Sequence, residues 1–310
     1  MVQVLVWILL LLSQIRASRP ATPSSRPNIV FILADDLGWN DVGFTGRSDL
    51  QTPNIDALAY HGRILSQHYS QPTCTPSRTA LLTGKYPIRT GMQGFPLTPG
   101  EPRALPLDQR LLPQYMKELG YQTHLVGKWH VGCHEWKYTP TARGFDTHFG
   151  YLNGYIGYYN HTMDILNMTG HDFWRGVEPM YDLRGRYVTD LLTEESVRLI
   201  ENAGSKKNSD PLFLLISHLA PHSGNPGSYH EYPEEDLERF NYIPDMNRRK
   251  YAAMVWNLDK SVGHVVKALA ETKMLHNTII AFVSDNGAQT IGLFPNDGSN
   301  YPFRGHVEKE

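Results

Sequence analysis

The chain has 310 residues, of which 41% are hydrophobic and 19% are charged, and its formal net charge is −2. This composition is typical of a globular protein and excludes the intrinsically disordered classes. Because Lys and Arg do not exceed Asp and Glu, the charge balance gives no indication of a nucleic-acid partner. The length suits one large hydrophobic core.

At the N-terminus, residues 1–18 have the features of a cleavable secretory signal peptide. An apolar run over 2–12 is shorter than the roughly 20 residues that a membrane-spanning helix needs, and the small residues Ala17 and Ser18 follow it. The alternative is a membrane anchor. No later run could span a bilayer, so we expect a Pro/Ser-rich linker at 19–26 to lead into a lysosomal or extracellular protein without a stable membrane anchor.

The first predicted elements are one strand and two helices. The segment NIVFILADD, residues 28–36, is an apolar run that ends in two acids, as expected for a strand buried on both faces of a sheet. A short helix is predicted over 52–62, with Thr52 as its N-cap and Gly62 at its end. A second helix is predicted to begin just after Cys74.

Helices and strands continue to alternate along the rest of the chain. Between Tyr251 and Leu269, apolar residues recur with the helical period and form one stripe. This alternation indicates an α/β fold with a large, mostly parallel sheet and helices on both faces. The Tyr/Gly-rich segment 149–159 is predicted to be a loop over the sheet edge. The remaining predicted elements are helix 112–120, strand 121–127, helix 186–204, strand 211–220 and strand 277–287.

Polar residues that end apolar runs are candidate site residues, because ligands in such folds bind beyond the carboxyl ends of the strands. Two pairs of them offer only oxygen ligands, namely Asp35 with Asp36 and Asp285 with Asn286. Such ligands suit a hard divalent cation, Ca²⁺ or Mg²⁺, better than zinc. For either pair alone, the alternative is helix capping and Asx-turn formation. Because both pairs end buried strands, a metal site is favoured.

Lys128 and His130 lie two positions apart in GKWHVG, and in an extended chain both would point to the same side. A cation beside a histidine suits an anionic substrate, with the histidine as acid or base. The alternative is a solvent-reaching Lys and a His bonded to backbone. His222 also ends an apolar run, whereas His218 lies inside that run and is interpreted as a core histidine.

Cys74 lies in the segment CTPSRTALLTGK, and the chain has two cysteines in all. As a plain nucleophile, Cys74 would need a nearby base and a lowered pKa. Arg78 would lie one helical turn away and could provide a positive charge. The alternative is an inert buried cysteine.

Two N-x-[ST] sequons, at Asn160 and Asn167, are candidate glycosylation sites and fit a secretory route. Both lie in the region 150–181, which we expect to shape substrate specificity.

Five segments, in this order, resemble the type I sulfatase family, whose members depend on formylglycine. The closest resemblance is to the arylsulfatase B group, the N-acetylgalactosamine-4-sulfatases and their relatives. The match runs from Pro27 to Gly305. The segments are PNIVFILADDLGWNDVGF, CTPSRTALLTGKYPIRTG, LGYQTHLVGKWHVG, RGFDTHFGY and FVSDNGA.

The resemblance implies an alkaline-phosphatase-like α/β fold and a sulfuric ester hydrolase. Its substrates would be sulfated carbohydrates, such as glycosaminoglycans, or aryl sulfates. The resemblance also implies that a formylglycine-generating enzyme oxidises Cys74 in the endoplasmic reticulum. One hydroxyl of the hydrated aldehyde would attack the sulfate sulfur. The second hydroxyl would then help to expel the sulfate, which a thiol could not do.

The resemblance further implies a role for each candidate site residue. The metal ligands, which would hold one calcium ion or a magnesium ion, are Asp35, Asp36, Asp285 and Asn286. Among the implied catalytic residues, Arg78 would brace the diol and Lys128 would contact the sulfate. His130 would act as the base that regenerates the aldehyde, and His222 would lie on the side of the leaving group.

Near its end, the sequence departs from the family pattern. The family has a sulfate-contacting Lys where Val307 stands, and residues 306–310 form a divergent tail. We therefore expect the catalytic domain, 27–305, to be incomplete and the small C-terminal domain to be missing. The alternatives are a catalytically impaired or inactive truncated product, and a related metal phosphohydrolase with an unmodified nucleophile. Cys133 is expected to be a free thiol, or to pair with Cys74 if conversion fails.

Overall fold

The computed structural model describes residues 26–46, 49–165, 167–205, 210–292 and 294–304. The predicted signal peptide (1–18), the divergent tail (306–310) and all but the last residue of the linker (19–26) lie outside these ranges. Within the described ranges, no helix is long and apolar enough to cross a bilayer.

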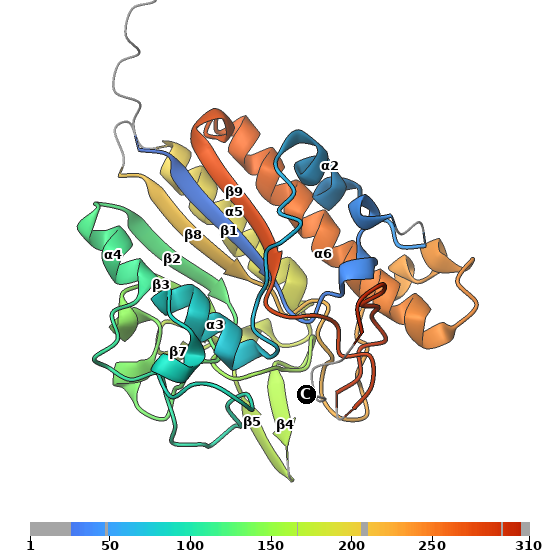
Figure 1. Cartoon of the computed structure of the whole chain (residues 1–310), viewed down its shortest axis with the longest axis horizontal. Coiled ribbons are helices and arrows are strands. Elements are labelled where there is room, and N and C mark those ends of the chain that lie inside the picture. Colours follow the sequence, from blue (N-terminus) through green and yellow to red (C-terminus); the bar gives the residue numbers. More distant parts are fainter. Residues whose placement is uncertain (1–25, 47–48, 166, 206–209, 293, 305–310) are drawn as a thin grey trace, which may run out of the picture.

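A seven-stranded sheet forms the centre of the molecule (Figure 1). Its order is β7-β6-β3-β2-β8-β1-β9, and all neighbouring strands pair in parallel except β3 with β6 and β6 with β7, so that β6 alone runs in the opposite direction. The predicted mostly parallel sheet is thus confirmed. The strands are β1 (Asn28–Ala34), β2 (Gln122–Gly127), β3 (Thr147–Gly150), β6 (Trp174–Arg175), β7 (Glu178–Pro179), β8 (Leu212–Ser217) and β9 (Thr278–Ser284).

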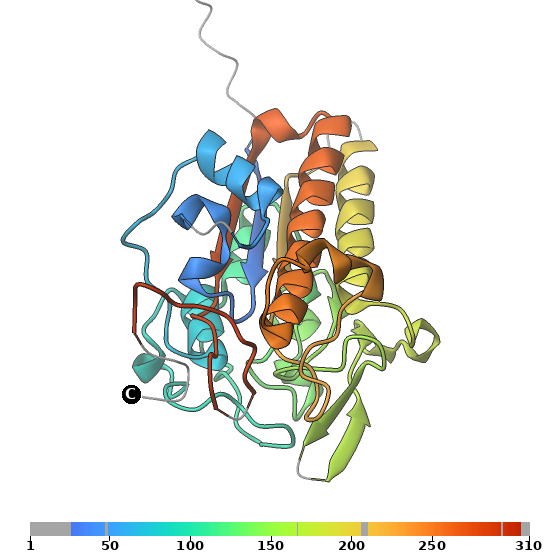
Figure 2. The same cartoon turned by 90° about the vertical axis from the view of Figure 1, so that its right-hand side faces the viewer.

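Helices lie on both faces of this sheet, as predicted (Figures 1 and 2). On one face, α5 (Val188–Ser205) and α6 (Met246–Glu271) lie side by side, and α2 (Pro53–His61) packs on α6. The opposite face carries α3 (Cys74–Thr83) and α4 (Leu112–Glu118). We call these the α5/α6 face and the α3/α4 face. Short 3₁₀ turns occur at 39–41, 43–45, 87–89, 136–138, 141–143, 181–183, 234–236, 238–240 and 275–277.

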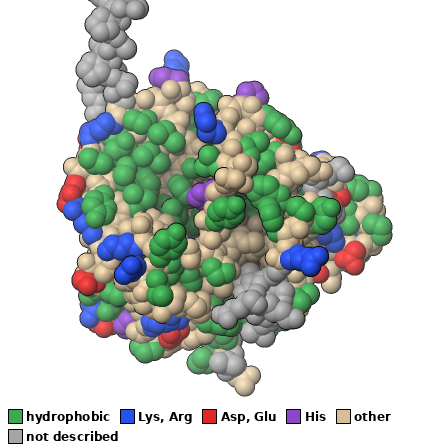
Figure 3. All heavy atoms as spheres, viewed as in Figure 1, with side chains coloured by type: hydrophobic (Ala, Val, Ile, Leu, Met, Phe, Trp, Pro, Cys, Tyr) green, Lys and Arg blue, Asp and Glu red, His purple; other side chains and the backbone are tan. Residues whose placement is uncertain are grey.

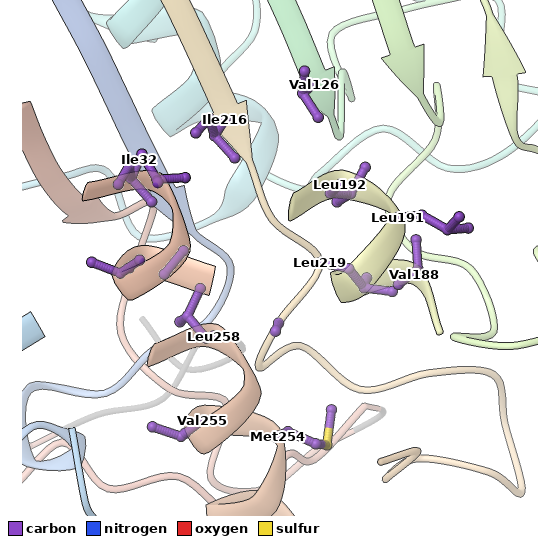
Figure 4. Packing of buried hydrophobic residues seen from close by; sticks show 14 of the residues in the cluster. Ile32, Val126, Val188, Leu191, Leu192, Ile216, Leu219, Met254, Val255 and Leu258 are labelled. Atoms are coloured by element: carbon purple, nitrogen blue, oxygen red, sulfur yellow. The ribbon is translucent and has the colours of Figure 1, made fainter. Parts of the chain in front are cut away.

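The α5/α6 face carries a continuous hydrophobic core (Figure 4). Ile32 of β1, Ile216 of β8 and Leu258 of α6 belong to this core and are completely buried. The helical stripe predicted for α6 packs into this core, since seven of its eight members are 0–1% exposed and Val266 is partly buried. The seven are Tyr251, Met254, Val255, Leu258, Val262, Val265 and Leu269.

The α3/α4 face is less completely covered. Leu33 and Leu215 are buried in the cluster that α3 and α4 complete. Ile29 and Phe31 of β1 are only partly buried, and their neighbour Ile279 of β9 is 54% exposed. Figure 3 shows hydrophobic side chains gathered on this face.

Several element boundaries differ from the predicted ones. α3 begins at Cys74 rather than after it, and β8 ends at Ser217, one residue before His218. The segment 149–159 is not entirely a loop, because its first two residues end β3. The hairpin of β4 (Thr162–Ile165) and β5 (Met168–His171) was not predicted either. Strands of two to four residues are too short to show a hydrophobic period.

The start of α2 is capped in an unexpected way. Thr52 occupies the N-cap position, but its side chain makes no capping hydrogen bond. Instead, Asp259 Oδ1 of α6 accepts hydrogen bonds from the backbone N–H groups of Asn54 at 3.0 Å and Ile55 at 2.8 Å. The N-terminus of α2 is therefore satisfied by the helix on which α2 packs, a tertiary contact that local sequence could not reveal.

Candidate functional site

The candidate site lies at the carboxyl edge of the sheet. Asp35 and Asp36 directly follow β1, and Asp285 and Asn286 directly follow β9. Because β1 and β9 are parallel neighbours, their ends bring both pairs together. All four residues are at most 3% exposed, and the Asp36 N–H donates to Asp285 Oδ1 at 3.2 Å.

Helix α3 brings Cys74 and Arg78 to the same edge, one helical turn apart. Cys74 Sγ lies 3.6 Å from Asp35 Oδ1 and 3.9 Å from Asp36 Oδ1. The Arg78 guanidinium donates to Asp285 Oδ2 through two nitrogens, at 2.8 and 3.1 Å. It also contacts Asp35 Oδ1 at 3.3 Å. Arg78 thus joins the acids that end two different strands.

The thiol of Cys74 is not in a setting that activates it. Burial raises its pKa well above the ordinary value. Lys128 lowers this pKa, but Asp285, Asp35 and Asp36 raise it further. Reactive cysteines normally have a depressed pKa, so these surroundings argue against a plain thiolate nucleophile.

Lys128 and His130 both lie just after β2, but their side chains have different partners. Lys128 Nζ donates to both carboxylate oxygens of Asp35, at 2.7 and 2.9 Å, and is fully buried. His130 has a φ of 57°, so the expectation of an extended Lys-x-His segment is wrong at this residue. His130 Nε2 lies 2.9 Å from the Leu97 carbonyl oxygen, and its Nδ1 is buried without a hydrogen-bond partner. Burial and nearby Lys128 lower the pKa of His130 well below its ordinary value.

His222 lies on the loop after β8. Its Nε2 is 3.5 Å from Asp36 Oδ2, and its Nδ1 is 2.7 Å from the Ser223 carbonyl oxygen. A carbonyl can only accept a hydrogen bond, so Nδ1 carries a proton and Nε2 faces the acids. His218 lies on the other side, in the α5/α6 core, with Nε2 3.2 Å from Ser261 Oγ. Its interpretation as a core histidine agrees with this placement.

The acids of the site fit a divalent cation. Asp36 Oδ2 and Asn286 Oδ1 are buried and have no hydrogen-bond partner, so two oxygens are available to coordinate an ion. Asp285 differs, since its oxygens already accept from the Asp36 N–H and from Arg78. Among the described His, Cys, Asp and Glu residues, Asp35, Asp36, Cys74 and His222 form a group whose ligand atoms all lie within 4.8 Å of one another.

The electrostatics of the site also favour a bound cation. Burial alone would raise the pKa of Asp35, but Lys128, His222 and Arg78 outweigh it and hold this pKa below the ordinary value. Burial and the Asp35 charge raise the pKa of Asp285 to about 6, against the lowering effect of the two cations. A divalent ion would compensate this excess of buried negative charge.

A pocket lies beside this cluster, and Asp36, Cys74, His130 and His222 line it. Much of the remaining lining is apolar. The apolar residues are Phe95, Pro96, Leu97, Pro99, Tyr155, Ile165 and Phe294, and the uncharged polar ones are Thr73, Thr98 and Gln289.

Sequence reasoning missed several residues that hold the site together. Ser217, the last residue of β8, accepts a hydrogen bond from Arg78. The Thr75 hydroxyl donates to the His130 carbonyl and accepts from the Leu97 N–H, both at 3.0 Å. Ser217 ends an apolar run as the acids do, and that signal could have found it. Thr75 carried no such signal.

Aromatic residues around the pocket were also missed. The ring of Tyr155 stacks on His222 with centroids 6.0 Å apart, and it contacts Phe294 at 4.8 Å. The Tyr/Gly-rich composition around Tyr155 indicated a loop but not which ring would face the pocket.

Cys74 and Cys133 are both free thiols, so the structure contains no disulfide between them. Cys133 is partly buried, with Sγ 3.8 Å from Asn153 Oδ1. The sequon residues Asn160 and Asn167 are both exposed.

Comparisons with known proteins show which family the chain resembles along most of its length. A family model described as Sulfatase matches residues 27–310. Arylsulfatase J of Mus musculus is 42% identical over 287 residues, which cover 91% of this chain and 45% of the relative. N-acetylgalactosamine-6-sulfatase of Mus musculus is 33% identical over 311 residues, which cover 96% of this chain and 57% of the relative. The chain therefore spans about half the length of the curated relatives it matches.

A solved structure described as Ps i-CgsB is 34% identical, with a TM-score of 0.81 over 90% of this chain and 62% of that chain. Together with the sheet topology, this likeness confirms the expected alkaline-phosphatase-like α/β fold. The relatives do not specifically support the arylsulfatase B group.

Proposed function

The chain belongs to the sulfatase family, and on that premise we propose that it is a sulfuric ester hydrolase. The proposed reaction converts R–O–SO₃⁻ and water to R–OH, sulfate and a proton. One observation carries the proposal. Cys74, Lys128 and Arg78 contact the same buried acid, Asp35, and Cys74 also lines a pocket.

The two cations give the site the means to bind an anion. Asp35 holds Lys128 and Asp285 holds Arg78, so both positive charges are in place before a substrate arrives. Preorganised cationic donors stabilise the charge that develops in a transition state. In the proposed roles, Lys128 contacts the sulfate and Arg78 braces residue 74.

His130 and His222 are the candidate groups for proton transfer. We propose that His130 acts as a base beside residue 74, and its unpartnered Nδ1 supports this role. We propose that His222 serves the leaving-group oxygen, since Ser223 holds its Nδ1 and the ring lines the pocket with Nε2 beside Asp36.

We further propose that Asp35, Asp36, Asp285 and Asn286 hold one calcium ion, or a magnesium ion, and that Cys74 is converted to formylglycine. When present, the ion would supply Lewis acidity and the aldehyde would supply the nucleophile. The unpartnered oxygens of Asp36 and Asn286 support the ion. The setting of Cys74 against two carboxylates disfavours a thiolate and supports conversion.

For the substrate, we propose a sulfated carbohydrate, such as a glycosaminoglycan, or an aryl sulfate. The name of one relative, N-acetylgalactosamine-6-sulfatase, supports a sugar sulfate. We propose a secretory route to the lysosome or the extracellular space, with a formylglycine-generating enzyme as partner during synthesis. The exposure of both sequon residues, Asn160 and Asn167, supports this route.

The test is turnover of 4-nitrophenyl sulfate by the chain produced in a secretory host together with a formylglycine-generating enzyme, in the presence of calcium. We expect wild type to release nitrophenol and the Cys74→Ala variant to release none above background. Equal rates for the two would contradict the proposal. The intact mass of the same sample reports whether residue 74 is an aldehyde. Turnover of 4-nitrophenyl phosphate by chain with an unmodified thiol would instead favour a metal phosphohydrolase.

A further inference from the structure

The pocket at the site is lined by both polar and apolar residues. Seven apolar residues of this lining come from three separate segments of the chain, and the exposure of Phe95, at 69%, places part of the set at the surface. We call this set the apolar collar. Its members are Phe95, Pro96, Leu97, Pro99, Tyr155, Ile165 and Phe294.

One part of the collar is fixed to the site by hydrogen bonds. The backbone of Leu97 bonds to Thr75 at 3.0 Å and to His130 at 2.9 Å. Arg103 donates to the Phe95 carbonyl at 3.1 Å, which ties down the outer part of the same loop. This part therefore keeps its shape relative to the reacting groups.

The other collar residues are fixed in the same manner. The Tyr155 hydroxyl donates to the Asp164 carbonyl at 2.9 Å and so holds the β4–β5 hairpin that carries Ile165. Ser223, next to His222 in the chain, donates to the Phe294 carbonyl at 3.0 Å. Both parts of the collar are thus bonded to residues at or beside the candidate proton-transfer groups.

The collar offers no compensation for a second negative charge. Among the described residues that line the pocket, none is Lys or Arg. Arg103, which braces Phe95, is already paired with Glu101 at 2.6 Å. Lys128 and Arg78 are not among the lining residues, and their proposed roles already assign them to the sulfate and to residue 74. The lining also contains Thr73, Thr98 and Gln289, but these side chains are uncharged. An anion placed beside the collar would therefore lose hydration without gaining a Lys or Arg partner.

We propose that the apolar collar is the leaving-group subsite, and that it selects esters whose sulfate is the only negative charge near the scissile bond. The inference rests on the proposed function and deepens it. An aromatic ring, or the apolar face of an uncharged sugar ring, can lie against Phe95, Tyr155 and Phe294. A leaving group that carries a carboxylate or a second sulfate beside the ester is disfavoured.

The test compares two aryl sulfates that differ by one charge, the sulfate ester of methyl 4-hydroxybenzoate and that of 4-hydroxybenzoate. We expect wild type to favour the methyl ester in kcat/KM by at least about tenfold, because only the carboxylate must be desolvated. Phe95→Lys should reduce this ratio by about tenfold, because it places a cation in the collar. Phe95→Leu is the matched control and should keep the ratio. Phe95 is 69% exposed, so these changes should leave the fold intact.

Ile165→Lys, with Ile165→Met as control, repeats the charge test in the other part of the collar. Binding of both esters to the Cys74→Ser variant, measured by calorimetry, gives a readout that does not depend on turnover. A wild-type kcat/KM ratio near one would overturn the collar inference while the proposed function stands. So would a ratio that neither lysine variant changes. A binding preference without any turnover would support the collar and contradict the proposed hydrolase. Absence of both binding and turnover would overturn both.

Discussion

The two faces of the central sheet are built differently. The α5/α6 face joins two long helices and α2 to the sheet through a continuous core, and residues such as Leu258 are completely buried there. The α3/α4 face has two shorter helices and leaves Ile29 and Phe31 only partly buried. Yet α3, on this less covered face, carries Cys74 and Arg78 into the site.

The difference separates stability from chemistry. Burial of apolar area is the main source of stability, so the α5/α6 face should supply most of it. The α3/α4 face, with the loops that follow β2, positions the groups that would react. Substitutions on the two faces should therefore have distinguishable effects, except where the strand ends meet.

The largest effect is expected at those strand ends, from Lys128→Ala. This variant leaves the buried Asp35 carboxylate without its closest cation, which should lower the free energy of unfolding by about 3–5 kcal/mol. Loss of a preorganised donor should also lower kcat by about 10²–10³-fold. Urea unfolding and aryl sulfate turnover are the measurements. Lys117→Ala is the control, since Lys117 pairs with Asp146 at the surface and should contribute about 0–1 kcal/mol. Similar losses of stability and activity in both variants would contradict the role given to Lys128.

Next in size is a pure stability effect on the α5/α6 face. Leu258→Ala removes a completely buried side chain from the core, which should cost about 2–5 kcal/mol. The fraction that remains folded should keep the wild-type kcat/KM for an aryl sulfate. A core variant that lost activity per folded molecule would show that the two faces are not separable.

A smaller effect, on activity rather than on stability, is expected from Gly154→Ala beside the pocket. A Cβ at this position would lie 2.8 Å from His130 Cε1, so the imidazole must move. Misplacement of a reacting group by about 1 Å can cost about 10²-fold in rate. Thermal unfolding should change little. Gly170→Ala is the control, because nothing lies within 4 Å of a Cβ there. Equal kcat/KM for the two variants would show that His130 is not a reacting group.

The smallest effect is a pH dependence of stability that arises from the α5/α6 face. Burial lowers the pKa of His218 to about 4 from an ordinary value of 6.5. Between these values the unfolded chain takes up a proton that the native chain does not, so stability falls as pH falls from 6.5 towards 4. By about pH 5 the loss should reach about 2 kcal/mol.

This dependence is measured by urea unfolding at about pH 7 and about pH 5. His218→Gln should reduce the difference between the two free energies by about 2 kcal/mol. His276→Gln, at an exposed position, should leave the difference as in wild type. If both variants kept the full difference, the acid sensitivity would come from other groups.

The sequence was most informative where a feature depends on strong local patterns. The stripe of α6 and the apolar runs of β1, β8 and β9 were predicted because their residues repeat with a clear period or form long runs. The strand-end acids were predicted to meet because parallel strands share a carboxyl edge. The family resemblance supplied the roles, which the residue types alone left open.

The remainder depends on contacts between distant segments. The bond from Asp259 to the start of α2 links residues about 200 positions apart, and no local signal indicates it. The turn at His130 depends on bonds to Leu97 and Thr75 rather than on its own neighbours. The collar is assembled from three such segments, so its apolar character became visible only in the structure.

The central position of β1 has a consequence for synthesis. Asn28 of β1 bonds to Leu212 of β8, 184 residues later, and to Thr278 of β9, 250 residues later. At about 5–20 residues per second, β1 waits roughly 10–50 s for its last neighbour. During this interval an apolar strand has no sheet to join, so slow folding and a need for chaperones are expected. The same interval leaves Cys74 exposed to solvent before α3 buries it against the strand ends, which is when the proposed conversion of this residue would have to occur.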